Sequence, residues 1–198
     1  MERNSTKKRK TLQELTLLDR FLFDKAVEDA EICRKILGII MEKDDFPEVT
    51  IGISEKTIEA FYDSRAVRLD LLAFTESDGV YNAEAQRKDK GYRYSVRRSR
   101  NYQAFVDVNL LEPGEVDFGK MQDSYTIFIS PYDLFHQGKY KYTFRMKCDE
   151  CPDLVLDDGA VRMFLCTKGT NDEDVSKELV EFLHCMDKAD FDIADVIK

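Results

Sequence analysis

The chain has 198 residues, of which 43% are hydrophobic and 35% charged, as expected for one globular domain with a sizeable core. No apolar run approaches the ~18 residues of a membrane span, and the polar start MERNSTKKRK lacks the apolar core of a secretory signal, so we expect a cytoplasmic protein with no membrane contact. The net charge of −9 argues against a general nucleic-acid binder, although residues 87–100 are locally strongly basic.

A basic arm and a helical region open the chain. Residues 1–10 are predicted to be a disordered basic arm, and residues 11–198 a single domain, because no repeat, low-complexity block or clear linker divides them. Apolar residues recur at helical spacing over residues 12–41, which predicts one or two helices with a break near residues 28–29. Asp19 is a candidate cap for a helix that starts within this region.

Short strands and a long helix come next. Four segments have the pattern of strands: residues 49–53, 57–62, 67–74 and 80–86. The tripeptide Ser77-Asp78-Gly79 is a turn signal that joins the last two into a hairpin. From residue 88 to about 108 the spacing is again helical, and basic residues flank the apolar stripe. These basic residues are Arg93, Arg97, Arg98 and Arg100.

The second half predicts three strands and one helix. The strands are expected at residues 125–129, 140–146 and 161–167, and an amphipathic helix at residues 172–187. The final DIADVIK has the pattern of the beginning of another element, so we expect the domain to be truncated at its C-terminus. The whole pattern predicts one α/β domain.

The five cysteines are expected to be free thiols. Their number is odd, their spacing is loose, and disulfides are rare in the cytoplasm. Cys148 and Cys151 form one close pair in CDEC, but a structural zinc site usually needs a second such pair, and none is present. A strand-end thiol pair is therefore favoured over a zinc site.

The predicted hairpin carries an acidic residue on each arm. Asp70 and Glu84 lie symmetrically about Ser77, so a turn centred there would place them opposite each other. Gln86 shares the face of Glu84 because side chains alternate along a strand. The three polar groups are therefore expected to meet on one face of the sheet.

Two readings of this acidic pair are open. Asp70 and Glu84 could be solvent-facing residues of an edge hairpin. Alternatively, a divalent metal between them would offset their repulsion, and oxygen-only ligands suit Mg²⁺ or Mn²⁺. The position of Asp70 inside an apolar run, and the basic segment after Gln86, favour a metal site that acts on phosphodiesters.

The chain resembles the PD-(D/E)XK nuclease family transposases, which are relatives of the recombination-promoting nucleases. The resemblance rests on a series of ordered segments that covers most of the chain. The segments are LTLLDRFLFDKAVED (15–29), RLDLLAF (68–74), NAEAQ (82–86), RRSRNYQAF (97–105), YTIFISPYDLF (125–135), YKYTFRMKCDE (140–150) and DDGAVRMFLCTKG (157–169). It implies a restriction-endonuclease-like core, in which helices flank a central mixed β-sheet.

The resemblance also implies a set of metal-site residues. Asp70 and Glu84 would bind the catalytic Mg²⁺ or Mn²⁺ with help from the backbone carbonyl of Ala85, and Gln86 takes the position that is usually lysine. An acidic residue of the first helix often completes such a site, and Asp19 matches it better than Glu28. Leu69 stands where the motif has proline.

The resemblance further implies that the helix at residues 88–108 lies along DNA. Arg97, Arg98 and Tyr102 match its RR-x(3)-Y pattern, and Arg93 is a further candidate DNA contact. Gln86 can orient a water but lacks the charge of lysine, so weak or absent activity is also open.

Three functions follow as hypotheses. The first is a metal-dependent DNA endonuclease that acts alone, as a homodimer or with other partners. The second is a catalytically degenerate nuclease fold that serves as a DNA- or protein-binding module, such as a remnant of a mobile element. The third is a regulatory protein that does not bind nucleic acid, which the net charge of −9 keeps open. No Gly-rich phosphate loop or nucleophile motif is present, so we expect no small-molecule cofactor.

Overall fold

The computed structural model describes residues 16–52, 57–58, 67–76, 79–108, 110, 114 and 117–188. The predicted basic arm and the C-terminal DIADVIK segment lie outside these residues, as do most of the predicted strand at 57–62 and the turn residues Ser77 and Asp78. Within the described residues, no helix combines the length and the apolar character needed to cross a membrane.

The first helical region contains two helices, as the break near residues 28–29 predicted. Helix α1 (Arg20–Ala26) begins directly after Asp19. Helix α2 (Ala30–Met41) begins after Asp29, whose carboxylate accepts hydrogen bonds from the backbone N–H groups of Glu31 and Ile32. This side-chain cap satisfies first-turn donors and sets the start of the second helix.

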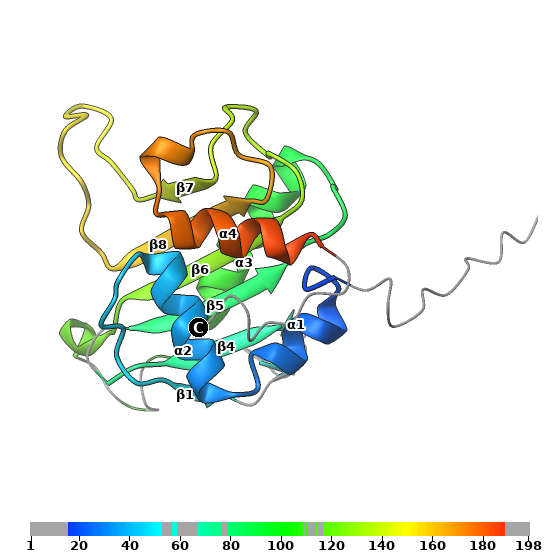
Figure 1. Ribbon diagram of the computed structural model, residues 1–198. Helices are drawn as coiled ribbons and strands as arrows, with labels where there is room; N and C mark the ends of the chain where they lie inside the picture. The colour runs from blue at the N-terminus through cyan, green and yellow to red at the C-terminus, as the bar shows by residue number, and fades with distance from the viewer. Residues whose placement is uncertain are drawn as a thin grey trace, which may run out of the picture.

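A six-stranded mixed sheet forms the centre of the molecule (Figure 1). In spatial order its strands are β1 (Thr50–Gly52), β4 (Leu71–Phe74), β5 (Val80–Ala85), β6 (Ser124–Ser130), β8 (Ala160–Cys166) and β7 (Lys141–Phe144). The pairs β5–β6 and β6–β8 are parallel, and the other three pairs are antiparallel. The short strands β2 (Thr57–Ile58) and β3 (Val67–Arg68) form a separate antiparallel pair. The α/β class predicted from the sequence is confirmed.

Helices cover both faces of the sheet (Figure 1). Helices α1, α2 and α4 (Lys177–Met186) lie on one face, where alternate strand residues such as Tyr81, Ile127 and Met163 join the main hydrophobic core. Helix α3 (Tyr92–Asp107) lies on the other face and packs against smaller clusters that include Leu72, Phe128 and Phe164. The two faces differ because successive side chains of a strand point in opposite directions.

The hairpin of β4 and β5 has the register that the symmetry about Ser77 predicted. Leu71 pairs with Ala83 and Phe74 with Val80, so Asp70, the residue before β4, faces Glu84. Gly79 closes the turn at a φ of 140°, and its carbonyl accepts hydrogen bonds from the backbone N–H and the hydroxyl of Thr75. The turn therefore determines which side chains meet further along the two strands.

Two predicted elements are each divided into two in the structure. The single strand at 67–74 is wrong, because β3 and β4 are separate at Asp70, whose backbone N–H donates to the carboxylate of Glu84. The helix expected at 172–187 is a short 3-10 turn η3 (Asp172–Asp174) followed by α4, because Ser176 caps α4 through the backbone N–H of Leu179. The 3-10 turn η2 (Phe118–Lys120) lies before β6.

Candidate active site

Asp70 and Glu84 meet on the α3 face of the sheet. The backbone N–H of Asp70 donates to Glu84 Oε1 at 3.0 Å, and the N–H of Ala85 donates to Asp70 Oδ2 at 3.3 Å. Both residues are buried, with 4% of Asp70 and 0% of Glu84 exposed. The interpretation of Asp70 and Glu84 as solvent-facing edge residues is therefore wrong. The predicted meeting of Asp70 and Glu84 is confirmed, and the reason is the hairpin register.

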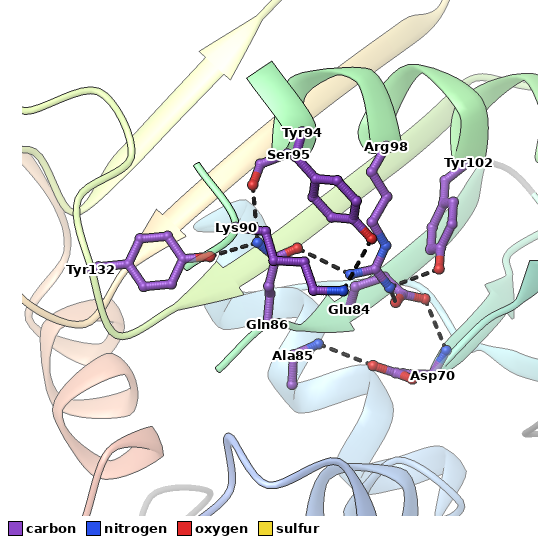
Figure 2. Close-up of polar contacts among 10 residues, drawn as sticks. All are labelled: Asp70, Glu84, Ala85, Gln86, Lys90, Tyr94, Ser95, Arg98, Tyr102 and Tyr132. Atoms are coloured by element: carbon purple, nitrogen blue, oxygen red, sulfur yellow. Dashed lines mark hydrogen bonds and ion pairs between the residues drawn. The ribbon is translucent and has the colours of Figure 1, made fainter. Parts of the chain in front are cut away.

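Arg98 joins the acidic pair from helix α3 (Figure 2). Its Nη2 atom donates to Glu84 Oε2 at 2.7 Å and to the Tyr102 hydroxyl at 2.7 Å. Its guanidinium also lies over the rings of Tyr102 and Phe128, at 4.7 and 5.3 Å from their centroids. These contacts hold a positive charge directly against a buried carboxylate.

The charges at this site shift the pKa values of the groups around Glu84. Burial lowers the pKa of Arg98, but the Glu84 carboxylate and Tyr102 outweigh burial, so the pKa is raised overall. The pKa of Tyr102 is raised by burial and by the negative charge of Glu84, although Arg98 acts in the opposite direction. At neutral pH, Arg98 is therefore a cation and Tyr102 is a neutral hydroxyl.

Gln86 is held by protein groups on both ends of its amide (Figure 2). Its Nε2 donates to the hydroxyls of Ser95 and Tyr132, at 3.0 and 2.5 Å. Its Oε1 accepts a hydrogen bond of 3.0 Å from Arg98 Nη1. Gln86 therefore orients Arg98, and a lysine here would have no acceptor to offer that guanidinium.

Sequence reasoning missed Ser95 and Tyr132. Ser95 is buried on α3, one turn before Ser99, and Tyr132 follows β6. The Tyr132 hydroxyl also donates to the carbonyl of Lys88, which follows Gln86 by two residues. The signal that could have found Tyr132 is the parallel pairing of β5 and β6, because the carboxyl ends of parallel strands lie at the same edge of a sheet.

Asp19 lies at the start of α1, and two partners of its carboxylate are residues other than Asp70 and Glu84. It accepts a hydrogen bond from the backbone N–H of Thr16 and forms an ion pair with Arg87, the residue after Gln86. Glu28, the weaker candidate, is an exposed partner of Lys25. Among the described residues, no group of three His, Cys, Asp or Glu side chains is placed to hold a metal ion. The role of Asp19 in the site stays a prediction.

The candidate DNA contacts on α3 point in two directions. Arg93, Arg97 and Arg100 are exposed, and none of their side chains has a hydrogen bond or ion pair with another described residue. Arg98 and Tyr102 instead turn inward, where Arg98 donates to the Glu84 carboxylate and to the Tyr102 hydroxyl. The matched RR-x(3)-Y residues therefore divide between an exposed face and the acidic pair.

The site thus combines two converging buried carboxylates, a guanidinium and a neighbouring exposed basic helix face. Such a combination can bind a phosphodiester and a divalent cation. No family model, curated protein or solved structure matches this chain.

Proposed function

We propose that this protein is a metal-dependent DNA endonuclease with a restriction-endonuclease-like core, related to the PD-(D/E)XK family transposases. The observation that carries the proposal is the meeting of buried Asp70 and Glu84 beneath a basic helix. The mixed sheet supports it, because an antiparallel hairpin that bears both acids adjoins two parallel strands. Burial of two carboxylates side by side is costly unless cations accompany them.

The donor atoms fit a hard divalent cation. Asp70 and Glu84 supply carboxylate oxygens, and the adjacent Ala85 supplies a backbone carbonyl, which is the ligand chemistry that Mg²⁺ and Mn²⁺ prefer. These three residues would hold the ion. When bound, the ion would polarise the phosphodiester and increase the acidity of a water.

Arg98 supplies the charge that the usual lysine would bring. Gln86 positions its guanidinium through Oε1, and Ser95 and Tyr132 fix the amide of Gln86 in turn. A preorganised cation next to the reacting phosphate stabilises the negative charge that develops during hydrolysis. The neutral Gln86 is therefore compatible with catalysis, because its neighbour carries the positive charge.

The exposed arginines of α3 bind the DNA backbone in this proposal. Arg93, Arg97 and Arg100 offer guanidinium groups without carboxylate partners among the described residues. Phosphate contacts of this kind position the duplex and carry no sequence information. Because the chain as a whole is acidic, affinity should depend strongly on salt.

A second candidate function is a catalytically inactive module that binds DNA or protein. The ion pair between Arg98 and Glu84 favours it, because this pair would persist without any metal. This alternative retains the fold and the basic helix. It predicts that Mn²⁺ does not raise the melting temperature of the protein.

The two functions are separated by plasmid nicking together with thermal unfolding. The wild type is compared with Asp70→Asn and Glu84→Gln in Mg²⁺ or Mn²⁺, and Asp153→Asn, an exposed acid on the β7–β8 connection, is the matched control. We expect nicking by the wild type and the control only, and a metal-dependent rise in melting temperature that both site variants lose. Equal nicking by all four proteins would contradict the endonuclease, and so would the absence of nicking in every case.

A further inference from the structure

An aromatic cavity lies beside α3, away from Glu84. Its volume is about 160 Å³, and it opens between α3 and the strands β7 and β8. Tyr92 and Val96 of α3, Phe144 of β7, Arg162 and Phe164 of β8, and Phe135 line it. Successive helix residues are about 100° apart, so Tyr92 and Val96 face a different direction from Arg98. The cavity is thus separate from the acidic pair, on the same helix.

The rings around this cavity are unusually exposed. Tyr92 is 58% exposed and Phe144 40% exposed, although both belong to an aromatic cluster. The rings of Tyr92 and Phe135 meet edge-on, with their centroids 5.8 Å apart. The ring centroid of Phe144 lies 4.9 Å from that of Phe135 and 5.8 Å from that of Phe164. Contiguous apolar groups that remain exposed around a surface cavity mark it as a candidate ligand site.

Arg162 gives the cavity a positive charge. It pairs with Phe144 in the register of β7 and β8, so the two side chains share the α3 face of the sheet. Within the described part of the chain, the side chain of Arg162 makes no hydrogen bond or ion pair. A half-buried guanidinium with no carboxylate partner among the described residues is suited to an anionic ligand, and its planar fork can donate two parallel hydrogen bonds to the oxygens of a phosphate.

The basic face of α3 adjoins the cavity. Arg93, Arg97 and Arg100 follow Tyr92 and Val96 around the helix on its exposed side. The ligand that best complements this face and the cavity carries several negative charges and also presents a flat aromatic group. Nucleic acid has both properties. An apolar peptide has no negative charge to pair with Arg162 or with the arginines of α3.

We propose that this cavity binds one unpaired nucleobase of single-stranded DNA, which stacks on Phe144 and Tyr92 while Arg162 contacts its phosphate. A base inside a duplex cannot enter, because its faces are covered by the neighbouring base pairs. The inference rests on the proposed function and narrows it to DNA that contains unpaired nucleotides, such as single strands, flaps or bubbles. Stacking of this kind tolerates any sequence.

The test is fluorescence anisotropy with a labelled single-stranded oligonucleotide and with its duplex, in EDTA so that no cleavage occurs. The variants are Phe144→Ala, Tyr92→Ala and Arg162→Gln, and Phe144→Tyr keeps a ring at the same position. Phe118→Ala is the matched control, because Phe118 is 73% exposed and does not line the cavity. Circular dichroism confirms that each variant is folded.

We expect Phe144→Ala to weaken single-strand binding by roughly fivefold to 100-fold, as the loss of one stacked base predicts. Phe144→Tyr and Phe118→Ala should stay within about twofold of the wild type, and duplex binding should change little in any of them. Equal losses for single strand and duplex, or no loss for either, would overturn the inference.

The two proposals fail in different ways. If the wild type nicks plasmid but Phe144→Ala binds single strands normally, only the base-binding cavity is wrong. If the wild type binds neither form of DNA at low salt, both proposals are wrong. If Phe144→Ala selectively loses single-strand binding while no protein nicks DNA, the cavity is supported and the endonuclease is overturned.

Discussion

The guanidinium of Arg98 lies 2.7 Å from the carboxylate of Glu84, and this ion pair joins helix α3 to the central strand β5. Only 1% of the Glu84 side chain is exposed, against 25% of Arg98, so solvent screens the pair weakly. The same guanidinium holds Gln86 and Tyr102. One arginine thus connects the basic helix α3 to the acids that are buried between this helix and the sheet.

The first prediction concerns Arg98 itself. Arg98→Ala should lower the free energy of unfolding by about 2–3 kcal/mol, because it leaves a buried carboxylate without its strongest partner. Arg98→Lys should recover part of this loss, since it keeps the charge but cannot reach three acceptors. Chemical denaturation measures both values. Arg97→Ala is the matched control, and this exposed neighbour should change stability by less than about 0.5 kcal/mol.

The same substitutions bear on catalysis. In the proposed endonuclease, Arg98→Ala should reduce the nicking rate by about 100-fold or more, as the loss of a preorganised charged group does in other enzymes. Rates are compared at a temperature where all variants are folded. An active Arg98→Ala variant would show that this guanidinium has a structural role only.

The second prediction concerns the replaced lysine. Gln86→Lys restores the residue type common in the wider superfamily, yet we expect it to lower stability by about 1–3 kcal/mol and to leave nicking no faster. The reason is that lysine places a second cation beside Arg98 and offers no acceptor to Nη1. Thermal unfolding and plasmid nicking check the two parts. A faster enzyme would contradict the assignment of the positive charge to Arg98.

The third prediction concerns the turn that aligns the acids. Gly79 has a φ of 140°, and a Cβ there would overlap the carbonyl oxygen of Asp123. Gly79→Ala should therefore cost more than about 3 kcal/mol of stability, since backbone strain adds to the overlap. Gly91 also has a positive φ, of 85°, but a Cβ there would meet nothing within 4 Å. Gly91→Ala should cost only about 1–2 kcal/mol. Unfolding in urea measures the loss of stability for both variants.

The fourth prediction concerns how the stability contributed by Glu42 depends on pH. Burial raises the pKa of Glu42, but hydrogen bonds from Lys141 and from the backbone N–H of Ser176 outweigh it, so the pKa is lowered overall. A carboxylate whose pKa is lowered by folding stabilises the folded protein at pH values above the ordinary pKa of glutamate. This stabilisation is lost as the pH falls through the pKa of Glu42 in the folded state. Glu42→Gln should therefore cost about 0.5–1 kcal/mol at pH 7.

The difference between Glu42→Gln and the wild type should disappear in acid, below the lowered pKa. Unfolding curves at neutral and acidic pH measure it. Glu48→Gln is the control, because Glu48 is exposed and its side chain makes no hydrogen bond or ion pair with another described residue. A cost that is the same at both pH values would mean that the carboxylate charge of Glu42 does not contribute.

The fifth prediction concerns thiol reactivity. All five cysteines are free, as expected, and burial raises the pKa of Cys33 to about 12. Cys151 is exposed in the β7–β8 connection. At pH 8, Ellman's reagent should react rapidly with Cys151 and with Cys33 only after unfolding, because the thiolate is the nucleophile. Cys151→Ser should remove the fast reaction, and rapid labelling of Cys33 would contradict its burial.

Local patterns in the sequence were sufficient for the hairpin and for most elements. The spacing of Asp70 and Glu84 about Ser77 predicted their meeting, because strand side chains alternate with a period of two and the turn sets the register. The break before α2 was also predictable. The exact extents of β4 and α4 were not, since a side chain on another strand and a capping serine decided them.

Only the tertiary structure decided which residues complete the site. Arg97 and Arg98 are neighbours in sequence, yet one is exposed and the other contacts Glu84, because each helix residue turns the side chain by about 100° and packing sets the phase. The partners of Gln86 come from α3 and from the segment after β6, which no local spacing relates. The sequence determined that two acids would meet, and packing of α3 on the sheet determined that an arginine would join them.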